Sequence, residues 1–289
     1  GDMERYVWFL NNTALSESDD ILIRAGEIVR FILINRTMMH HPIHLHGHFF
    51  RVVNGQGDRS PLKHTVDVAP MSTTVIEFDA SERGDWFFHC HLLYHMMNGM
   101  ARVVHYEGVE QTPELAAIRP GLYHDEWHAM GQADLLSSMT EGFFMLSGTR
   151  TTLAADWEAG WQNVSDLEWE GLFTGSRYIN SFWSVFAGVD LMGAGSYSEA
   201  TRAVLGVRTL LPLSLELRAW VDTGGGARVG LEKHLPLTPR LEIGGAVRYD
   251  THDLWEGQAG LSYTLSKDVS ILARWHSAFG FGGGLAVRF

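Results

Sequence analysis

Two short segments of the chain gather side chains that bind transition metals. Residues 41–47 read HPIHLHG and residues 89–95 read HCHLLYH, and the second segment holds the only cysteine of the 289-residue sequence. Side chains two apart share one face of a β-strand, while the residue between them points to the opposite face. We therefore expect His89 and His91 to lie on one side of a sheet edge and Cys90 on the other.

These residues divide into two candidate ligand sets. One set combines a thiolate, two imidazoles and a thioether, the ligand type of blue-copper electron-transfer sites: Cys90, His41, His95 and Met100. The other set contains imidazoles alone: His44, His46, His89 and His91. Soft sulfur ligands favour copper over magnesium, calcium or manganese, and a methionine ligand is unusual for zinc. The sequence therefore predicts two copper-binding sites, joined through Cys90.

A metal-free interpretation of the same residues must be weighed against this one. A lone cysteine in a cytosolic protein is usually a small buried hydrophobe, and single histidines are often structural. Two His-X-His pairs, with a cysteine inside one pair and a methionine ten residues after it, favour the metal sites. Four further histidines lie outside this pattern and are interpreted as structural or surface residues: His40, His48, His64 and His105.

The elements before about residue 108 read as short β-strands. Residues 28–34, 64–68 and 73–78 are rich in Val, Ile, Thr and Phe, and turn residues such as Asn54-Gly55 and Pro70 separate them. This pattern predicts an antiparallel β-sandwich. It would hold both histidine motifs at the ends of its strands.

A different β pattern follows after about residue 146. Apolar and polar residues alternate strictly over 213–221, 241–250, 269–276 and 285–289, so each strand has one apolar face. In a soluble sandwich that face points inward, whereas in an outer-membrane barrel it points toward lipid. Tight turns at 223–226 and 236–239 and the final Phe289 favour the barrel, as do tryptophans placed to form interface girdles: Trp157, Trp161, Trp169, Trp183, Trp220, Trp255 and Trp275. We expect about 8–10 antiparallel strands.

The composition changes between these two halves. Histidine is concentrated before residue 110, tryptophan from residue 127 onward, and residues 111–113 and 120–121 read as loop. We therefore predict a β-sandwich domain over 1–108, a linker over 109–145 and an outer-membrane-type barrel over 146–289. Four residues of that segment are interpreted as ordinary linker residues rather than as copper carriers: His124, His128, Met130 and Met139.

The two metal motifs resemble the final cupredoxin domain of the multicopper oxidases, the laccase-like family. The wider pattern, from DMERY at 2–6 through TMMHHP at 37–42 to HLLYHM at 91–96, is similar to the periplasmic copper-resistance oxidases, the copper resistance protein A group. It covers about residues 1–107. The resemblance implies a Greek-key cupredoxin sandwich and an enzyme that oxidises Cu(I) or a similar reductant and reduces O₂ to water.

The resemblance also implies a role for each ligand. The type 1 copper would be held by His41, Cys90, His95 and Met100, and electrons would pass through Cys90 and its neighbours His89 and His91. His44 would serve the type 2 copper, and the type 3 pair would use His46, His89 and His91. The family's trinuclear cluster needs twice the four histidines that this chain provides for it. The missing ones belong to an amino-terminal cupredoxin domain, so we expect a longer polypeptide or another subunit to complete the cluster.

The second half resembles the outer-membrane copper-resistance barrel, the copper resistance protein B group, so we expect a periplasmic and outer-membrane location. The sequence opens GDMER, without the features of a signal peptide, so we expect any targeting segment to lie outside it. A net charge of −12 argues against nucleic acid as a partner. Two other hypotheses remain: an electron-transfer or copper-sequestering module with type 1 copper only, and a transport protein in which the barrel does the work.

Overall fold

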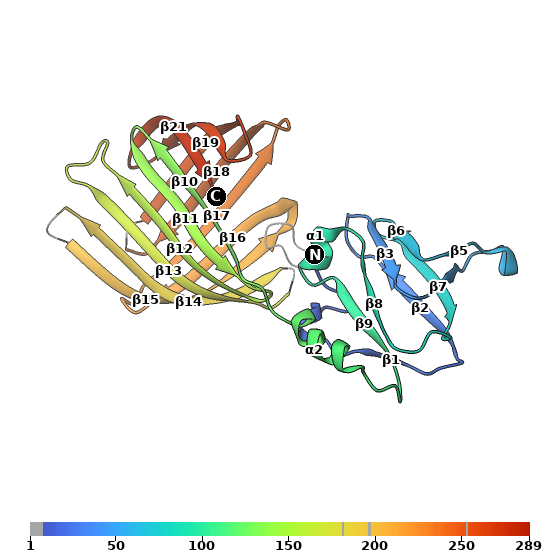
Figure 1. Cartoon of the computed structure of the whole chain (residues 1–289). Helices are drawn as coiled ribbons and strands as arrows, with labels where there is room; N and C mark the ends of the chain where they lie inside the picture. Colours follow the sequence, from blue (N-terminus) through green and yellow to red (C-terminus); the bar gives the residue numbers. More distant parts are fainter. Residues whose placement is uncertain (1–7, 181, 196–197, 253) are drawn as a thin grey trace. The chain divides into compact units, whose positions relative to one another are not determined.

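The computed structural model describes residues 8–180, 182–195, 198–252 and 254–289. The chain divides into two compact units, residues 1–126 and 127–289 (Figure 1). Both units are built from β-strands, and the expected all-β class, a sandwich followed by a closed barrel, is confirmed. The motif expected at residues 2–6 lies outside the described residues. Within the described part, no helix is long and apolar enough to cross a membrane.

The first unit is a sandwich of two sheets. Among the described residues, one sheet has the strand order β1 (Ile21–Ile23), β9 (Ala101–Tyr106), β8 (Asp85–Cys90), β3 (His41–Leu45) and β6 (Thr65–Val68). The other has the order β2 (Ile28–Ile34), β7 (Thr73–Asp79), β4 (Phe50–Val52) and β5 (Leu62–Lys63). Apolar side chains from both sheets form one core, which includes Leu45, Phe88 and Ile76. Because this core fixes β3 and β8, it also fixes the two metal motifs that they carry.

The described part of this unit also has two α-helices and two short 3-10 helices, Leu15–Glu17 and Gly57–Arg59. Helix α1 (Leu93–Met97) follows β8 directly. Helix α2 (Pro113–Leu122) begins with a proline in its first turn, and the Thr112 hydroxyl accepts the backbone N–H of Leu115 at 3.3 Å. Arg119 of α2 forms ion pairs with both Asp20 and Asp85, so α2 is fastened to the sandwich.

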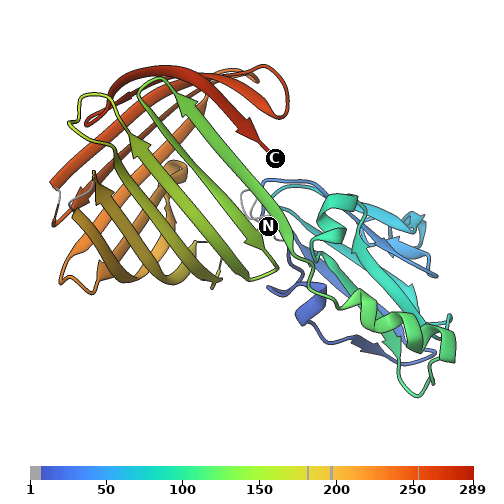
Figure 2. The same ribbon diagram turned by 60° about the vertical axis from the view of Figure 1, so that its left-hand side comes forward.

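The second unit is a closed antiparallel barrel (Figure 2). In the described residues it has twelve strands, each paired with the next, and the first pairs with the last. The strands are β10 (His128–Leu136), β11 (Met139–Ser147), β12 (Thr151–Gly160), β13 (Glu168–Tyr178), β14 (Trp183–Ala194), β15 (Ser198–Leu211), β16 (Leu215–Asp222), β17 (Ala227–Pro236), β18 (Leu241–Asp250), β19 (Leu254–Thr264), β20 (Val269–His276) and β21 (Gly280–Arg288).

Three expectations need correction here. The barrel has twelve strands rather than 8–10. The additional strands β10 and β11 begin in the segment that we assigned to a linker, 109–145, which also contains α2. Trp220 does not belong to an outer girdle, because it is buried with Phe186 inside the barrel. A tryptophan on the inner face of a strand packs on neighbouring side chains instead of meeting an interface.

The two faces of the barrel wall differ sharply in polarity. Large apolar side chains are exposed at alternate positions on the outside, for example Leu205, Ile271 and Leu285. Charged side chains such as Arg228 and Asp190 are buried at the positions between outward-facing residues. The alternation that the sequence showed therefore has its apolar face outward.

Candidate metal centre

A buried thiol lies between two imidazoles at one end of the sandwich. Cys90 is the last residue of β8, His41 is the first residue of β3, and His95 lies on α1. The Cys90 Sγ lies 3.8 Å from His41 Nδ1 and 3.6 Å from His95 Nδ1, and these three residues are at most 3% exposed. The described structure therefore brings three of the four predicted blue-copper ligands within contact of one another.

The fourth predicted ligand, Met100, lies in the same apolar core as Cys90. Its carbonyl oxygen accepts the Cys90 backbone N–H at 3.0 Å, which pairs the end of β8 with the residue that precedes β9. Gly99 holds the tight turn before it with a φ of +104°, and a Cβ added to this glycine would lie only 2.5 Å from Ala14 Cβ. Any side chain at Gly99 would collide, so the approach of Met100 to the core depends on this glycine.

Hydrogen bonds fix the tautomer of His41. Its Nε2 lies 2.9 Å from the Thr37 hydroxyl oxygen, which in turn donates to Asn35 Oδ1 at 2.9 Å. The hydroxyl proton is thus used, so His41 Nε2–H donates to Thr37 and the Nδ1 lone pair is directed at Cys90. A second hydrogen bond of this kind orients metal-binding histidines in general.

Burial sets the charges of this site. It lowers the pKa of His41 to about 4, with a further contribution from neighbouring His95, and it also lowers the pKa of His95. Burial raises the pKa of the Cys90 thiol. Two neutral imidazoles and a thiol that ionises only beside a cation suit a soft metal ion. With the Met100 thioether in the same core, this donor set fits copper.

The imidazole set lies on the other side of Cys90. His44 stands opposite His89 in the pairing of β3 with β8, and one ring nitrogen from each of His44, His46 and His89 lies within 4.8 Å of the other two. The His46 and His89 Nε2 atoms are 3.1 Å apart. His91 is exposed, and its ring centroid is 5.6 Å from that of His44. All four predicted imidazoles therefore face one region.

Backbone carbonyls direct two of these imidazoles. His89 Nδ1–H donates to the carbonyl of Cys90 at 2.9 Å, and His44 Nδ1–H donates to the carbonyl of His64 at 2.6 Å. Each bond leaves the Nε2 lone pair free to bind a metal. Gly47 turns the chain after His46 with a φ of +70°, and any Cβ there would lie 2.5 Å from the Trp86 ring.

Three residues around the two sites were missed by the sequence reasoning. Trp8 stacks on His95, with ring centroids 4.6 Å apart and an interplanar angle of 18°. Thr65 places its hydroxyl 3.0 Å from His44 Nδ1 and 2.9 Å from His64 Nδ1, so His64 belongs to the surroundings of the imidazole set. No spacing in the sequence indicates these contacts, because they depend on which strands pair.

The remaining histidines of this unit have other partners. His40 pairs with Asp67 on the surface, His48 contacts the Tyr106 hydroxyl at 2.6 Å, and His105 contacts Asp85 at 2.5 Å. Of the residues weighed as copper carriers, His124 and His128 belong to none of the potential His, Cys, Asp and Glu metal clusters found in the described residues. Met130 and Met139 lie on β10 and β11.

A third group of potential ligands lies inside the barrel and suits a metal poorly. It comprises Glu158, Glu256 and His276. His276 Nδ1 accepts two backbone N–H groups, at 3.3 and 3.4 Å, so its Nε2 carries the proton and donates to Glu256 at 3.0 Å. Arg248 already binds both carboxylates. A metal would have to displace both a proton and a guanidinium.

Comparison with known proteins concerns the first unit. The multicopper oxidase family model matches residues 1–108. Copper resistance protein A of Escherichia coli is 43% identical over 107 residues, which cover 37% of this chain and 18% of that protein. Multicopper oxidase MmcO of Mycobacterium tuberculosis is 37% identical over 106 residues, covering 37% of this chain and 21% of that protein. Among solved structures, the multicopper oxidase McoA of Aquifex aeolicus matches 30% of this chain and 21% of its own, with 32% identity and a TM-score of 0.27.

The chain spans about a fifth of the length of the curated relatives it matches. Residues 1–108 are therefore homologous to one part of the multicopper oxidases, a family that uses copper as its cofactor.

Proposed function

We propose that residues 1–108 are the carboxy-terminal domain of a copper-resistance oxidase that takes electrons from Cu(I) or a similar reductant and delivers them to O₂. In this proposal His41, Cys90, His95 and Met100 hold the copper that accepts electrons. The four imidazoles on the opposite side supply half of the cluster at which O₂ is reduced to water.

One arrangement carries this proposal: Cys90 joins the two ligand sets through covalent bonds. Its Sγ faces His41 and His95, whereas its backbone neighbours His89 and His91 face the imidazole set. Copper, when bound, supplies one-electron redox chemistry. Electrons that pass from the buried sulfur to His89 or His91 would therefore follow the Cys90 main chain.

The residues of this chain have distinct tasks in that scheme. The apolar core around Cys90 excludes water from the thiolate, and Thr37 keeps the His41 lone pair directed at the site. On the other side, His46 and His91 are exposed. An open imidazole face can meet both O₂ and a second set of ligands. We infer that this second set comes from an amino-terminal cupredoxin domain, on the same polypeptide or on a partner subunit.

For the second unit we propose an outer-membrane barrel, related to the copper resistance protein B group, that anchors the oxidase domain on the periplasmic side. The apolar outer face and charged inner face of the wall support this assignment, because lipid requires apolar side chains outside a barrel. The tether would use residues 127–289.

A second candidate function is favoured by the count of imidazoles. The described residues of this chain provide four on the open face, half of what the family's cluster uses. Without a partner, the domain would act as a type-1-only electron-transfer or copper-sequestering module, attached to the barrel and without oxidase activity.

Oxygen consumption with Cu(I) as reductant separates the two functions. We expect the copper-loaded chain alone to be inactive and to gain activity when the amino-terminal domains of a related oxidase are added. Cys90→Ser should abolish that gain while the variant still folds. Copper retention without oxidase activity under every condition would instead support the second function.

A further inference from the structure

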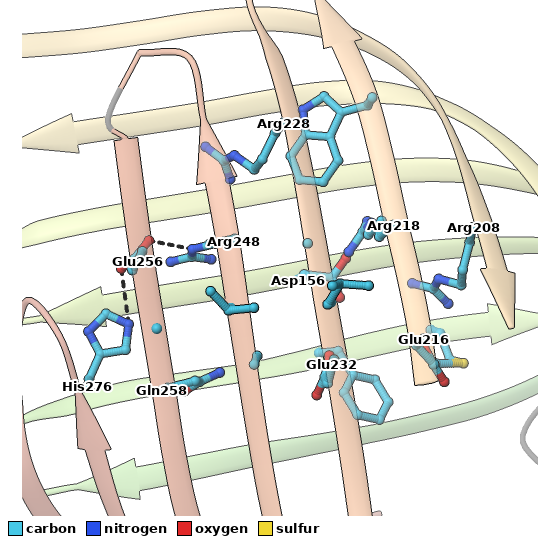
Figure 3. Close-up of a pocket in the computed structure, with 18 residues that line it drawn as sticks. Asp156, Arg208, Glu216, Arg218, Arg228, Glu232, Arg248, Glu256, Gln258 and His276 are labelled. Carbon is cyan, nitrogen blue, oxygen red and sulfur yellow. Dashed lines mark hydrogen bonds and ion pairs between the residues drawn. The ribbon is translucent and has the colours of Figure 1, made fainter. Parts of the chain in front are cut away.

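A cavity of about 340 Å³ lies inside the barrel, and all the residues that line it belong to the second unit. Apolar side chains such as Phe143 and Met145 line part of it. Most of the side chains labelled in Figure 3 are charged. Four arginines reach it: Arg208, Arg218, Arg228 and Arg248. How well each arginine is neutralised decides what the cavity can bind.

Two of these arginines are fully engaged by carboxylates. Arg228 forms ion pairs with Glu170, Asp190 and Asp250, and Arg248 pairs with Glu158 and Glu256. A guanidinium held by two or three carboxylates has little capacity left for a ligand.

The other two arginines differ. Arg208 on β15 and Arg218 on β16 stand directly opposite each other in the strand pairing, an arrangement that is unfavourable for like charges. Arg208 has no ion pair or hydrogen bond from its side chain to any residue in the described parts of the barrel. Arg218 has one long contact, 3.4 Å to Asp156, and its Nε is buried without a partner.

The surroundings hold Arg218 in place. Its guanidinium carbon lies 5.1 Å from the Phe186 ring centroid and 5.5 Å from that of Trp220, so aromatic rings flank it. Figure 3 shows Arg208 and Arg218 projecting into the same part of the cavity, with Asp156 close to Arg218. A planar donor fixed in this way is prepared for a bidentate acceptor.

Two further carboxylates line the cavity and limit the charge of a ligand. Glu216 and Glu232 stand opposite each other on β16 and β17. Glu232 receives a hydrogen bond from His234 at 2.9 Å, and neither glutamate lies within ion-pair distance of Arg208 or Arg218 among the described side chains. A ligand with several negative charges would be repelled by this pair.

We propose that the cavity is a binding site for a small oxyanion, a carboxylate or a phosphate group held between the guanidinium groups of Arg208 and Arg218. The anion accepts hydrogen bonds from the unpartnered Arg218 Nε–H and from the guanidinium N–H groups of Arg208. Its negative charge offsets the repulsion between the two arginines. The apolar side of the cavity, with Phe143 and Met145, accommodates a short hydrocarbon portion.

Isothermal titration of the full chain, refolded in detergent, with sodium acetate and with inorganic phosphate tests this site. We expect saturable binding of at least one anion, weakened about tenfold or more in Arg208→Gln and Arg218→Gln, since each removes a charge-assisted bidentate contact. Arg288→Gln is the matched control, because Arg288 contacts Gln132 and Ser270 and does not line the cavity. Far-ultraviolet circular dichroism reports whether each variant folds.

Saturation by acetate with weak phosphate binding would assign a carboxylate ligand, and the reverse result would assign a phosphate. Arg208→Lys, which keeps the charge and loses the planar fork, should bind with intermediate affinity, and it serves as the test if the glutamine variants do not fold. The proposal is overturned if neither anion binds, or if the arginine variants bind as the control does. Either result would mean that Arg208 and Arg218 do not form an anion-binding site.

Discussion

Replacing Arg119 tests whether α2 belongs to the first unit, although the family match ends at residue 108. The side chain is 15% exposed and joins α2 to Asp20 and Asp85. Breaking a fully buried ion pair by removing one partner costs about 3–5 kcal/mol, and an exposed pair contributes about 0–1 kcal/mol. The two carboxylates keep other partners, Tyr123 for Asp20 and His105 for Asp85. We therefore expect Arg119→Ala to destabilise the docking of α2 by about 2 kcal/mol.

Hydrogen–deuterium exchange measured by mass spectrometry reports this local change. A loss of about 2 kcal/mol corresponds to roughly 30-fold faster exchange of the α2 amides. Glu114→Gln is the control on the same helix, because Glu114 is exposed and has no ion pair within the described residues. If Arg119→Ala changes α2 exchange by less than about threefold, the ion pairs do not hold the helix and the energetic reasoning is wrong.

Three further predictions concern single side chains. Thr65→Val removes a hydroxyl that helps to orient the His44 ring, whereas the carbonyl of His64 still accepts from His44. Because only one of the two orienting contacts is lost, Zn(II) titration should give binding at the imidazole set that is weaker by about tenfold. Trp8→Leu removes the ring stacked on His95, and competition with a Cu(I) chelator should reveal about tenfold weaker copper retention; unchanged retention would mean that the ring only fills space. Burial and the Asp20 carboxylate raise the pKa of Tyr123 to about 12, so its contribution to stability is complete below pH 10 and is lost as the pH rises through 12. In urea titrations the stability lost between these pH values should therefore be smaller for Tyr123→Phe than for the unmodified chain.

The two metal motifs could be predicted from the sequence because their ligands lie close together along the chain. The period of a β-strand alone separates Cys90 from His89 and His91, and the structure has the sulfur and the imidazoles on opposite sides. The contacts of Trp8 and Thr65 could not be predicted from the sequence, because they join elements that are far apart along the chain. Strand β3 meets β6 only through the fold of the sandwich, and that pairing brings Thr65 to His44.

The barrel was recognised from its alternating strands, but its first two strands were not. The outward positions of β10 are largely small, including Gly131, so the strand lacks a clear apolar face in the sequence. The structure explains the small residues: a Cβ on Gly131 would lie 2.5 Å from the Phe289 ring, and one on Gly142 would lie 2.4 Å from Trp157. Aromatic rings from other parts of the barrel cover these two glycines and add apolar surface at positions where the strands have no side chain.

An absorption and EPR spectrum of the copper-loaded chain, with the metal counted per molecule, tests the central claim most directly. We predict an intense visible thiolate-to-copper band that disappears in Cys90→Ser, with about one copper in that site. A metal-loaded chain without such a band, or a band that survives Cys90→Ser, would contradict the assignment of Cys90, His41 and His95 as copper ligands.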